Sequence, residues 1–380
     1  MLNIGILATV LSPYLSVVPP IIMAFLIYKK KIPIILHPIN VGLFLLFIWS
    51  IISGIANKSL LSALASFLLL LYISLNIYLQ DYLKNQETID KFLHKVWTCS
   101  FMAGILGLIE KLASYFVDMT WTSDLYFKGP YKPTVENYRI YSTFGNPNIA
   151  GAWFAAMVLL AFYLYGRKKE DKKGWYLLSM GVFALALIAT GSRGATVGLL
   201  LGILVYGLCN KNKVARITLI AIFVAVLVFA LLSPEINHPA KSRNIIWEKS
   251  IHLFLDKPIT GWGTFGIWQN IKKTHAHNIW ISMLALYGAV GLTLYLWVKS
   301  YIIRLLFLLG KNNNPAFPLL ASIQGMIVGH GIVDFIIMAP QGGILFFVCS
   351  SIILSLAKQY QTQTYPELVF KEIGYINRKA

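Results

Sequence analysis

The chain has 380 residues, of which 57% are hydrophobic and only 13% are charged, and its mean hydropathy is +0.66. Soluble domains carry roughly 25% charged residues, so this composition excludes an ordinary soluble domain and indicates a polytopic membrane protein. The formal net charge of +18 raises a second possibility, a nucleic-acid-binding protein. The three cysteines, Cys99, Cys209 and Cys349, show neither a disulfide framework nor metal-ligand spacing.

Apolar stretches of the length needed to cross a bilayer recur along the chain. We expect about eleven transmembrane helices, within a range of ten to twelve. They cover residues 2–28, 39–56, 60–79, 97–117, 148–165, 175–190, 195–209, 217–233, 278–298, 317–338 and 344–356. The first is interrupted by Pro13 and Pro19, so it is either a kinked span or a re-entrant pair. The sequence therefore predicts an all-α fold with a single transmembrane domain over residues 1–357 and a cytoplasmic tail over 358–380.

Lysines and arginines sort by side when these spans are laid out in order. With residues 29–31 placed in the cytoplasm, the inner segments hold nearly two thirds of the 33 basic residues, including the run 167–173. Basic residues collect on the cytoplasmic side of membrane proteins, so the positive charge is mostly a topology signal and nucleic acid is not an expected partner. The same alternation places two long segments, 118–145 and 234–277, outside. The second is expected to be helical, and we expect the chemistry on this outer face.

The segment before the fifth expected span contains turn residues, Gly145 and Asn146, close to Arg139. Asn148 is a plausible N-cap for the helix that follows. One interpretation is a structured turn into a helix. The alternative is that Arg139 and the amides of Asn146 and Asn148 line a polar outer cavity.

A second candidate is the short connection Thr190–Thr196, in which Arg193 lies between Gly191 and Gly194. An arginine in so tight a turn should face a cavity or an anionic ligand, unless it extends its charged head to the membrane interface. Glycines allow close approach of the backbone, and the next helix directs its N-terminal N–H groups toward the same region. We favour a phosphate contact for Arg193.

The longest polar stretch, Lys241–Gly288, combines cations, turn residues and two close histidines. Arg243 lies on an expected helix, whereas His275 and His277 precede the span that begins at Asn278. A histidine outside a membrane is usually solvated or structural. Neutral imidazole is also a good base near neutral pH, and we take His277 as the candidate catalytic base and His275 as a secondary candidate.

A third group lies inside a span. His330 and Asp334 are four residues apart, so they are expected on one face of a helix in its outer half. Ionisable residues within the membrane are functional candidates by default. A structural histidine–aspartate pair that holds the bundle together is the alternative.

Laid out in order, these pieces resemble the O-antigen ligase and O-antigen polymerase family of bacterial membrane glycosyltransferases. The matching pieces are residues 142–148, residues 191–195, the stretch from Arg243 to Gly263, and His277-Asn278 with Gly288. His277 and Gly288 are separated by ten residues, as in the ligase signature. Each motif alone is a weak signal. Four motifs in the right order, all placed outside by the charge argument, are specific for the family but do not distinguish its members.

The resemblance implies a metal-independent glycosyltransferase of the GT-C type in the cytoplasmic membrane, with no cofactor. Such an enzyme takes a glycan from an undecaprenyl-diphosphate carrier on the outer face and transfers it to a hydroxyl of a lipid- or saccharide-linked acceptor. By analogy, Arg193 and Arg243 hold the diphosphate and His277 assists the acceptor hydroxyl. Membrane lipids are the other expected partners. The remaining substrate-binding candidates are Arg139, Asn146, Asn148, His275, Asn278, His330 and Asp334.

The residue types support these roles independently of the resemblance. A diphosphate leaving group gains negative charge as the sugar–oxygen bond breaks, and without a metal, fixed cations must stabilise that charge. The planar guanidinium of arginine matches phosphate oxygens and stays charged. The outer carboxylates Asp118, Asp124 and Asp256 are scattered without paired spacing, which favours a metal-free route.

Two other functions remain open on the sequence alone. A polymerase or a protein-glycosylating member of the same family would share the donor and the cations, and no residue distinguishes its acceptor. A small-solute transporter would instead place its polar groups on broken helices near mid-membrane. Most polar residues here lie outside the expected spans, which favours the enzyme.

Overall fold

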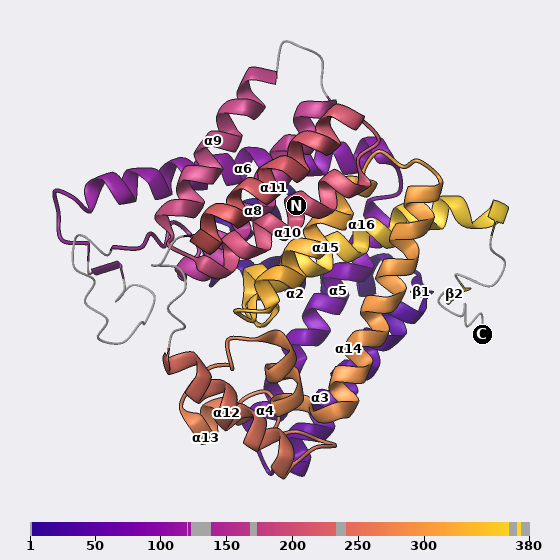
Figure 1. Ribbon diagram of the computed structural model, residues 1–380. Coiled ribbons are helices and arrows are strands. Elements are labelled where there is room, and N and C mark those ends of the chain that lie inside the picture. Colours follow the sequence, from indigo (N-terminus) through magenta and orange to yellow (C-terminus); the bar gives the residue numbers. More distant parts are fainter. Residues whose placement is uncertain are drawn as a thin grey trace.

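The computed structural model describes residues 2–119, 121–122, 138–167, 173–232, 241–364 and 371–373. Within them the chain is almost entirely helical (Figure 1), which confirms the expected all-α class. The strands are β1 (Ile34–Leu36) and β2 (Lys371–Ile373), which pair antiparallel. The α-helices are α1 (Leu2–Leu11), α2 (Val18–Lys30), α3 (Pro38–Ala56), α4 (Leu60–Ala65), α5 (Phe67–Tyr82), α6 (Gln86–Ala113), α8 (Pro147–Arg167), α9 (Lys173–Ala189), α10 (Arg193–Cys209), α11 (Lys213–Leu232), α12 (Lys241–Asp256), α13 (Gly266–Ile271), α14 (Ile279–Lys311), α15 (Phe317–Gly331) and α16 (Pro340–Thr364).

Six stretches in the described part of the chain are long and apolar enough to cross a membrane. They are Pro38–Ala56, Leu60–Tyr82, Gln86–Ala113, Pro147–Arg167, Ile279–Lys311 and Pro340–Tyr360, and shorter apolar helices cover Leu2–Leu11, Lys173–Ala189 and Arg193–Cys209. Six such stretches support a polytopic membrane protein but fall short of the predicted count of about eleven. The difference arises because several expected spans form helices of 17 residues or fewer, such as α9 and α10.

The predicted boundaries differ from the structure in places where one helix continues. The expected span 278–298 is the first part of α14, a 33-residue helix that continues to Lys311. The expected first span forms two helices, α1 and α2, separated by a single 3-10 turn (Leu15–Val17), as its prolines indicated. The polar segment expected to be helical contains α12 and α13 within its described residues, which begin at 241.

Helix α8 lies at the centre of the main hydrophobic core. It is rich in small residues, and its Ala150, Ala155 and Ala156 side chains are fully buried. A helix that is apolar on all sides packs within a bundle rather than at its edge, and small residues allow neighbouring helices to approach closely. The N-terminal end of this buried helix carries Asn148, so the core fixes the position of that side chain.

Helices α10 and α15 pack through glycines. A Cβ at Gly198 would lie 2.8 Å from the Met326 carbonyl oxygen, and one at Gly202 would lie 3.2 Å from the Ser322 carbonyl oxygen. Backbones this close leave no space for side chains between the helices. The packing joins the start of α10, which carries Arg193, to the end of α15.

Gly288, the glycine of the histidine–glycine signature, lies at an unwound turn of α14. It adopts φ 66° and ψ −169° inside α14, a conformation that favours glycine. The Ala289 N–H donates to the Pro258 carbonyl oxygen at 2.8 Å, and the Gly263 N–H donates to the Leu286 carbonyl oxygen at 2.7 Å. A Cβ at Gly288 would lie 2.1 Å from the Ile259 carbonyl oxygen. The loop after α12 is therefore docked into an unwound turn of α14.

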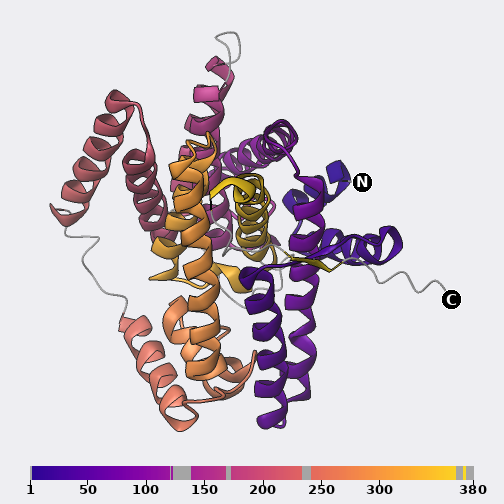
Figure 2. The ribbon, with the colours of Figure 1, turned by 90° about the vertical axis from the view of Figure 1, so that its right-hand side faces the viewer.

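The long helices α3 and α14 run beside each other and carry α12 and α13 near their ends (Figures 1 and 2). Side chains on α3 secure this arrangement: the Trp49 Nε1–H donates to the Tyr287 carbonyl oxygen at 2.8 Å, and the Ser53 hydroxyl donates to the Thr260 carbonyl oxygen at 2.6 Å. The polar stretch is thereby held as a rigid part of the helical bundle.

Candidate active site

A cleft of about 480 Å³ opens between the start of α8, the first turns of α12 and the loop before α14. Its basic lining comes from separate parts of the chain. The lining residues are Arg139, Asn148, Arg243, Ile245, Ile246, Lys249, Ile271, Lys273 and His277. The cleft therefore combines four permanent cations with one histidine and an apolar wall. This volume is typical of small-molecule pockets.

His277 lies at the end of the loop that leads into α14. Its φ of 52° is in the left-handed region, which non-glycine residues rarely adopt. Strain of this kind persists where the surrounding structure holds it, and it concentrates at functional sites. Asn278 holds the next turn, because its Oδ1 accepts the Trp280 and Ile281 N–H groups at 2.9 and 3.1 Å. The cap therefore fixes the position of His277, which directly precedes Asn278.

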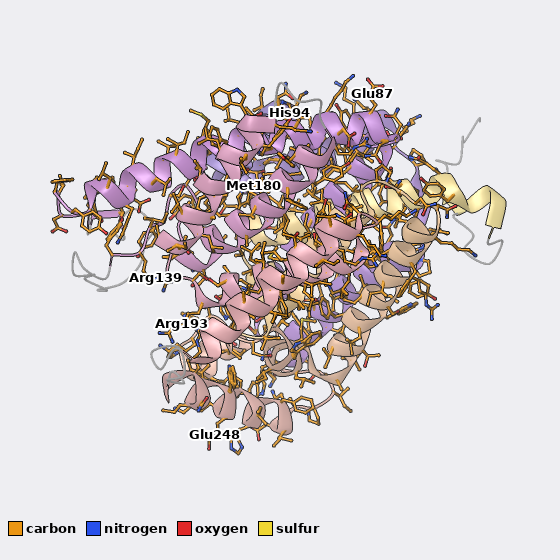
Figure 3. The ribbon with its side chains drawn as sticks, turned by 45° about the horizontal axis from the view of Figure 1, so that its top comes forward. Glu87, His94, Arg139, Met180, Arg193 and Glu248 are labelled. Carbon is orange, nitrogen blue, oxygen red and sulfur yellow. The ribbon has the colours of Figure 1, made fainter. Side chains whose placement is uncertain are left out.

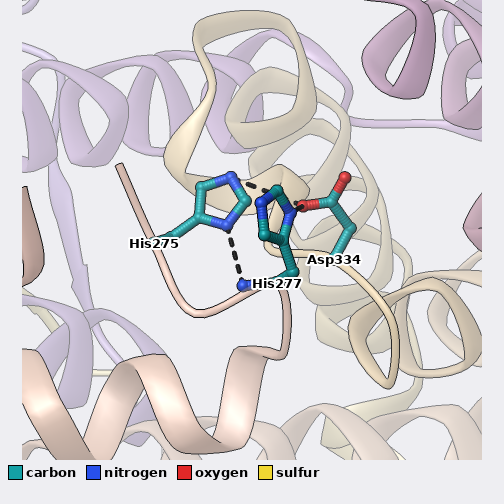
Figure 4. A group of neighbouring side chains, drawn as sticks. All are labelled: His275, His277 and Asp334. Atoms are coloured by element: carbon teal, nitrogen blue, oxygen red, sulfur yellow. Dashed lines mark hydrogen bonds and ion pairs between the residues drawn. The ribbon is translucent and has the colours of Figure 1, made fainter. Parts of the chain in front are cut away.

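Asp334 lies next to both loop histidines (Figure 4). Its Oδ1 is 3.4 Å from His277 Nδ1 and 3.4 Å from His275 Nε2. The carboxylate also accepts the Asn148 Nδ2–H at 2.7 Å and the Phe335 N–H at 2.8 Å. Burial alone raises the pKa of a carboxyl group. Here the Asn148 amide, the Phe335 N–H and the two histidine rings surround the carboxylate with hydrogen-bond donors, which favour its ionised form.

The hydrogen bonds indicate which ring nitrogen of each histidine carries the proton. His275 Nδ1 accepts the His277 N–H at 3.1 Å, so a neutral His275 ring carries its proton on Nε2, toward Asp334. Burial lowers the pKa of His275 to about 4, which keeps this ring neutral near pH 7. For His277, the ionised Asp334 favours a proton on Nδ1 and leaves the Nε2 lone pair as the proton acceptor. The arrangement is that of a general base oriented by a carboxylate.

The same three side chains form a potential metal-ligating group, which the sequence analysis did not anticipate. One ligand atom from each of His275, His277 and Asp334 lies within 4.8 Å of the others. A histidine binds a metal through a nitrogen lone pair. In His275 the Nδ1 lone pair already accepts the His277 N–H, so the neutral ring has no lone pair on the Nε2 atom that faces Asp334. This hydrogen-bond pattern fits an aspartate–histidine pair better than a metal site.

Arg139 is held in place by two hydrogen bonds. Its Nε–H donates to the Thr190 carbonyl oxygen at 2.7 Å, and its Nη2–H donates to Asn148 Oδ1, also at 2.7 Å. Asn148 thereby connects the arginine to Asp334. The cap of α8 is Asn146, not Asn148 as predicted, because Asn146 Oδ1 accepts the Asn148 N–H at 2.8 Å. Since α8 begins two residues earlier than expected, the Asn148 side chain is available for this bridge.

Glu110 anchors the segment that carries Arg139. Its Oε1 accepts the Tyr138 hydroxyl at 2.6 Å and the Tyr141 N–H at 2.9 Å, and its Oε2 accepts the Ser142 N–H at 2.6 Å. The Lys111 ammonium donates to the Tyr138 carbonyl oxygen at 2.8 Å. Glu110 and Lys111, neighbours on α6, therefore both bind the loop 138–142. The role of Glu110 was missed because the loop lies about 30 residues further along the chain.

Arg193 has an exposed side chain at the first turn of α10 (Figure 3). Within the described part of the chain it is not among the residues that line the cleft. The glycines beside it have structural roles. Gly191 adopts φ 58° directly against Arg139, and a Cβ at Gly194 would lie 2.8 Å from Val333. The tight turn thus supports Arg139, while the Arg193 side chain is exposed.

Arg243 and Lys249 reach the cleft from one face of α12. They lie at positions 243 and 249 with Ile246 between them, and a spacing of three keeps side chains on one helix face. Arg243 lines the same cleft as His277, so its positive charge faces the space beside the histidine. This spacing is the sequence signal that could have identified Lys249.

His330 and Asn278 lie beside the cleft rather than in its lining. The Asn278 Nδ2–H donates to the Ile332 carbonyl oxygen at 2.9 Å, and His330 is fully buried. Helix α15 ends at Gly331, so Asp334 does not share a helix face with His330 as expected. It lies in the turn that follows, where its N–H donates to the His330 carbonyl oxygen at 2.9 Å.

The fold and the cleft together define a polytopic α-helical membrane protein with a basic site around an aspartate-backed histidine. Residues 178–296 match the family model described as O-antigen ligase. A curated O-antigen ligase of Pseudomonas aeruginosa is 27% identical over 189 residues, which cover 48% of this chain and 46% of the relative. The chain thus aligns with about half the length of that relative.

These matches confirm the resemblance to the O-antigen ligase family that the motifs show. The matched region begins in α9 and ends in α14, so it contains Arg193, Arg243 and His277. It excludes Arg139 and Asn148, which the fold brings to the same cleft, and Asp334, which contacts His277.

Proposed function

We propose that this protein transfers a glycan from an undecaprenyl-diphosphate carrier to an acceptor hydroxyl, as an O-antigen ligase does. The observation that carries the proposal is the convergence of Arg139, Arg243 and His277 on one cleft, with Asp334 behind the histidine. The cations suit a diphosphate, and the histidine suits an acceptor hydroxyl. The similarity to the O-antigen ligase family supports the reaction class.

In the proposed reaction the acceptor oxygen attacks the anomeric carbon of the carrier-linked sugar. The bond between that carbon and the diphosphate oxygen breaks, and the diphosphate leaves with the electron pair. Its growing charge is stabilised by Arg139 and Arg243. The hydroxyl proton passes to His277 Nε2, and Asp334 stabilises the resulting imidazolium.

The proposed reaction is metal-independent. Fixed guanidinium groups replace a divalent cation at the leaving group. The Nε2–H of the neutral His275 ring argues against metal binding to the histidine pair. Arg193, which is exposed and outside the cleft lining, is assigned the outer part of the carrier diphosphate or the adjacent lipid headgroup. His275 is assigned to position Asp334 and His277 rather than to contact the substrate.

The cleft is proposed to face the outside of the cytoplasmic membrane. The charge alternation along the chain supports this orientation, because most basic residues fall in the opposite segments. We propose about eleven membrane-embedded segments in a GT-C-like arrangement: the six longer spans together with α1, α9, α10, α11 and α15.

A reconstituted assay tests this function. The purified full chain in proteoliposomes receives a carrier-linked glycan with three acceptors offered separately: a lipid-linked oligosaccharide core, a second carrier-linked glycan, and a glycosylatable peptide. The proposal predicts transfer to the first acceptor, in chelator as well as without it. Extension of the second acceptor would identify a polymerase. Absence of all transfer, or activity that only a divalent cation restores, would contradict the proposal.

A further inference from the structure

A second cleft, of about 300 Å³, lies between α10, α14 and α15. Among the described residues it shares no lining side chain with the cleft around His277. Its walls are almost wholly apolar, with Leu201 and Val205 from α10 and Ile302 and Leu306 from α14. A small number of polar groups in an apolar cleft usually orients a ligand.

The polar groups are Lys299 from α14 and Gln324 from α15. Lys299 is only 7% exposed, and its Nζ–H donates to Gln324 Oε1 at 2.6 Å. The ammonium lies 5.4 Å from the ring centroid of Phe346 and 6.0 Å from that of Tyr295. In the part of the chain that the structure describes, no carboxylate forms an ion pair with it. A buried cation is thus held by one amide oxygen and two aromatic rings.

Hydrogen-bond donors are in excess at this position. An ammonium group has three N–H donors and a side-chain amide has two. The Gln324 Nε2 atom is buried without a hydrogen-bond partner, and Gln324 Oε1 is already used by Lys299. Buried charges are normally paired, and buried donors are normally satisfied. The group that this pair lacks is an anion with oxygen acceptors.

The cleft is open at the surface of the helical bundle. Ile303 and Phe307 line it and are 50% and 72% exposed. Both belong to α14, a candidate membrane span, so this surface faces lipid. Lys299 lies 20 residues after Ile279, about 30 Å along α14 at 1.5 Å per residue, which is close to the thickness of the hydrocarbon core. That position suits a headgroup at the cytoplasmic boundary.

We propose that this cleft binds an anionic phospholipid. A phosphate oxygen accepts hydrogen bonds from the Lys299 ammonium and the Gln324 amide, while an acyl chain lies along the apolar walls from α10 and α14. A phosphate that carries no compensating amine is preferred, because the cleft supplies positive charge and, among its described lining residues, no negative charge to pair with an amine. The site is independent of glycan transfer.

Native mass spectrometry of the full chain in detergent tests this proposal. The wild-type protein is titrated with phosphatidylglycerol, with phosphatidylcholine and with inorganic phosphate. We expect phosphatidylglycerol to bind at least about tenfold more tightly than phosphatidylcholine. Lys299→Met should remove the preference and Lys299→Arg should keep it. The matched control is Lys311→Met, an exposed cation on the same helix, which should leave the preference unchanged.

Three results would overturn the proposal. They are equal affinity for the two lipids in the wild type, an unchanged preference in Lys299→Met, and binding of inorganic phosphate as tight as that of phosphatidylglycerol. If Lys299→Met does not fold, Gln324→Leu serves as the second variant and should weaken phosphatidylglycerol binding while the ammonium remains. Unchanged binding in Gln324→Leu would also contradict the assignment.

Discussion

At the scale of single residues, the account rests on how His277 is held. Its left-handed backbone and the long contact with Asp334 place the ring at the edge of the basic cleft. A contact of 3.4 Å is long for a hydrogen bond, and such contacts often tighten only when substrate binds. The aspartate selects the ring tautomer rather than transferring a proton itself.

The first prediction concerns this pair. His277→Ala should lower the rate of transfer by about 10²–10⁴-fold, because the acceptor hydroxyl loses its base. Asp334→Asn should cause a loss of similar order, because the amide no longer selects the Nδ1–H tautomer. Both rates are measured in the reconstituted assay, with His252→Ala on α12 as the exposed control. Full activity in Asp334→Asn would remove the aspartate from the mechanism.

A second prediction concerns His275 and pH. Burial lowers its pKa to about 4, against about 6.5 in an unfolded chain. Between these values the unfolded state binds the proton more readily, so stability is lost as the pH falls from about 6.5 to about 4. The shift corresponds to a loss on the order of 3 kcal/mol.

Thermal unfolding across this pH range measures the effect. His275→Asn keeps an acceptor for the His277 N–H but cannot be protonated, so its stability should change less steeply with pH than that of the wild type. Identical slopes for the two proteins would show that His275 does not titrate as described.

At the scale of elements, the loop 138–142 determines where Arg139 lies. Glu110 on α6 binds this loop by three hydrogen bonds, and Arg139 extends from it to Thr190 and Asn148. A third prediction follows. Glu110→Gln replaces one acceptor oxygen by an N–H₂ group that opposes a loop N–H, so the affinity for the carrier-linked donor should fall by about tenfold, roughly 1.4 kcal/mol.

The measurement is the Michaelis constant for the donor in detergent solution, beside the rate at saturating donor. If Glu110 only positions Arg139, its substitution raises the Michaelis constant for the donor and largely preserves the rate at saturating donor. Glu248→Gln, on the exposed face of α12, is the control. A purely structural role for Glu110 would lower the melting temperature without changing the constant for the donor.

Sequence patterns identified the elements better than their connections. Apolar runs predicted the helices, and the residue types identified Arg243, His277 and Asp334 as candidate site residues. The kink at Gly288 and the bridge through Asn148 depend on contacts between distant segments, which local patterns do not encode. The Asn146 cap is local, but the sequence offered Asn146 and Asn148 as neighbouring alternatives. Periodicity also cannot show where α14 ends, because Lys299 and Lys311 lie on one continuous helix.

At the scale of the whole molecule, the orientation in the membrane decides which substrates reach the cleft. The fourth prediction is that Lys273→Cys, at the cleft, reacts with a membrane-impermeant thiol reagent added to intact cells. Lys311→Cys, at the other end of α14, should react only after permeabilisation. The background for both is a variant without Cys99, Cys209 and Cys349. The reverse pattern would place the cleft in the cytoplasm.

The central claim is that one basic cleft binds a lipid diphosphate, and direct binding tests it most closely. Affinity for undecaprenyl diphosphate is measured with the purified full chain for the wild type, Arg139→Ala, Arg243→Ala and the control Arg216→Ala. Loss of a charged hydrogen bond is worth roughly 1.5–3 kcal/mol, so each of the first two variants should bind about 10- to 100-fold more weakly, and the control should match the wild type. Unchanged affinity in both Arg139→Ala and Arg243→Ala would contradict the account.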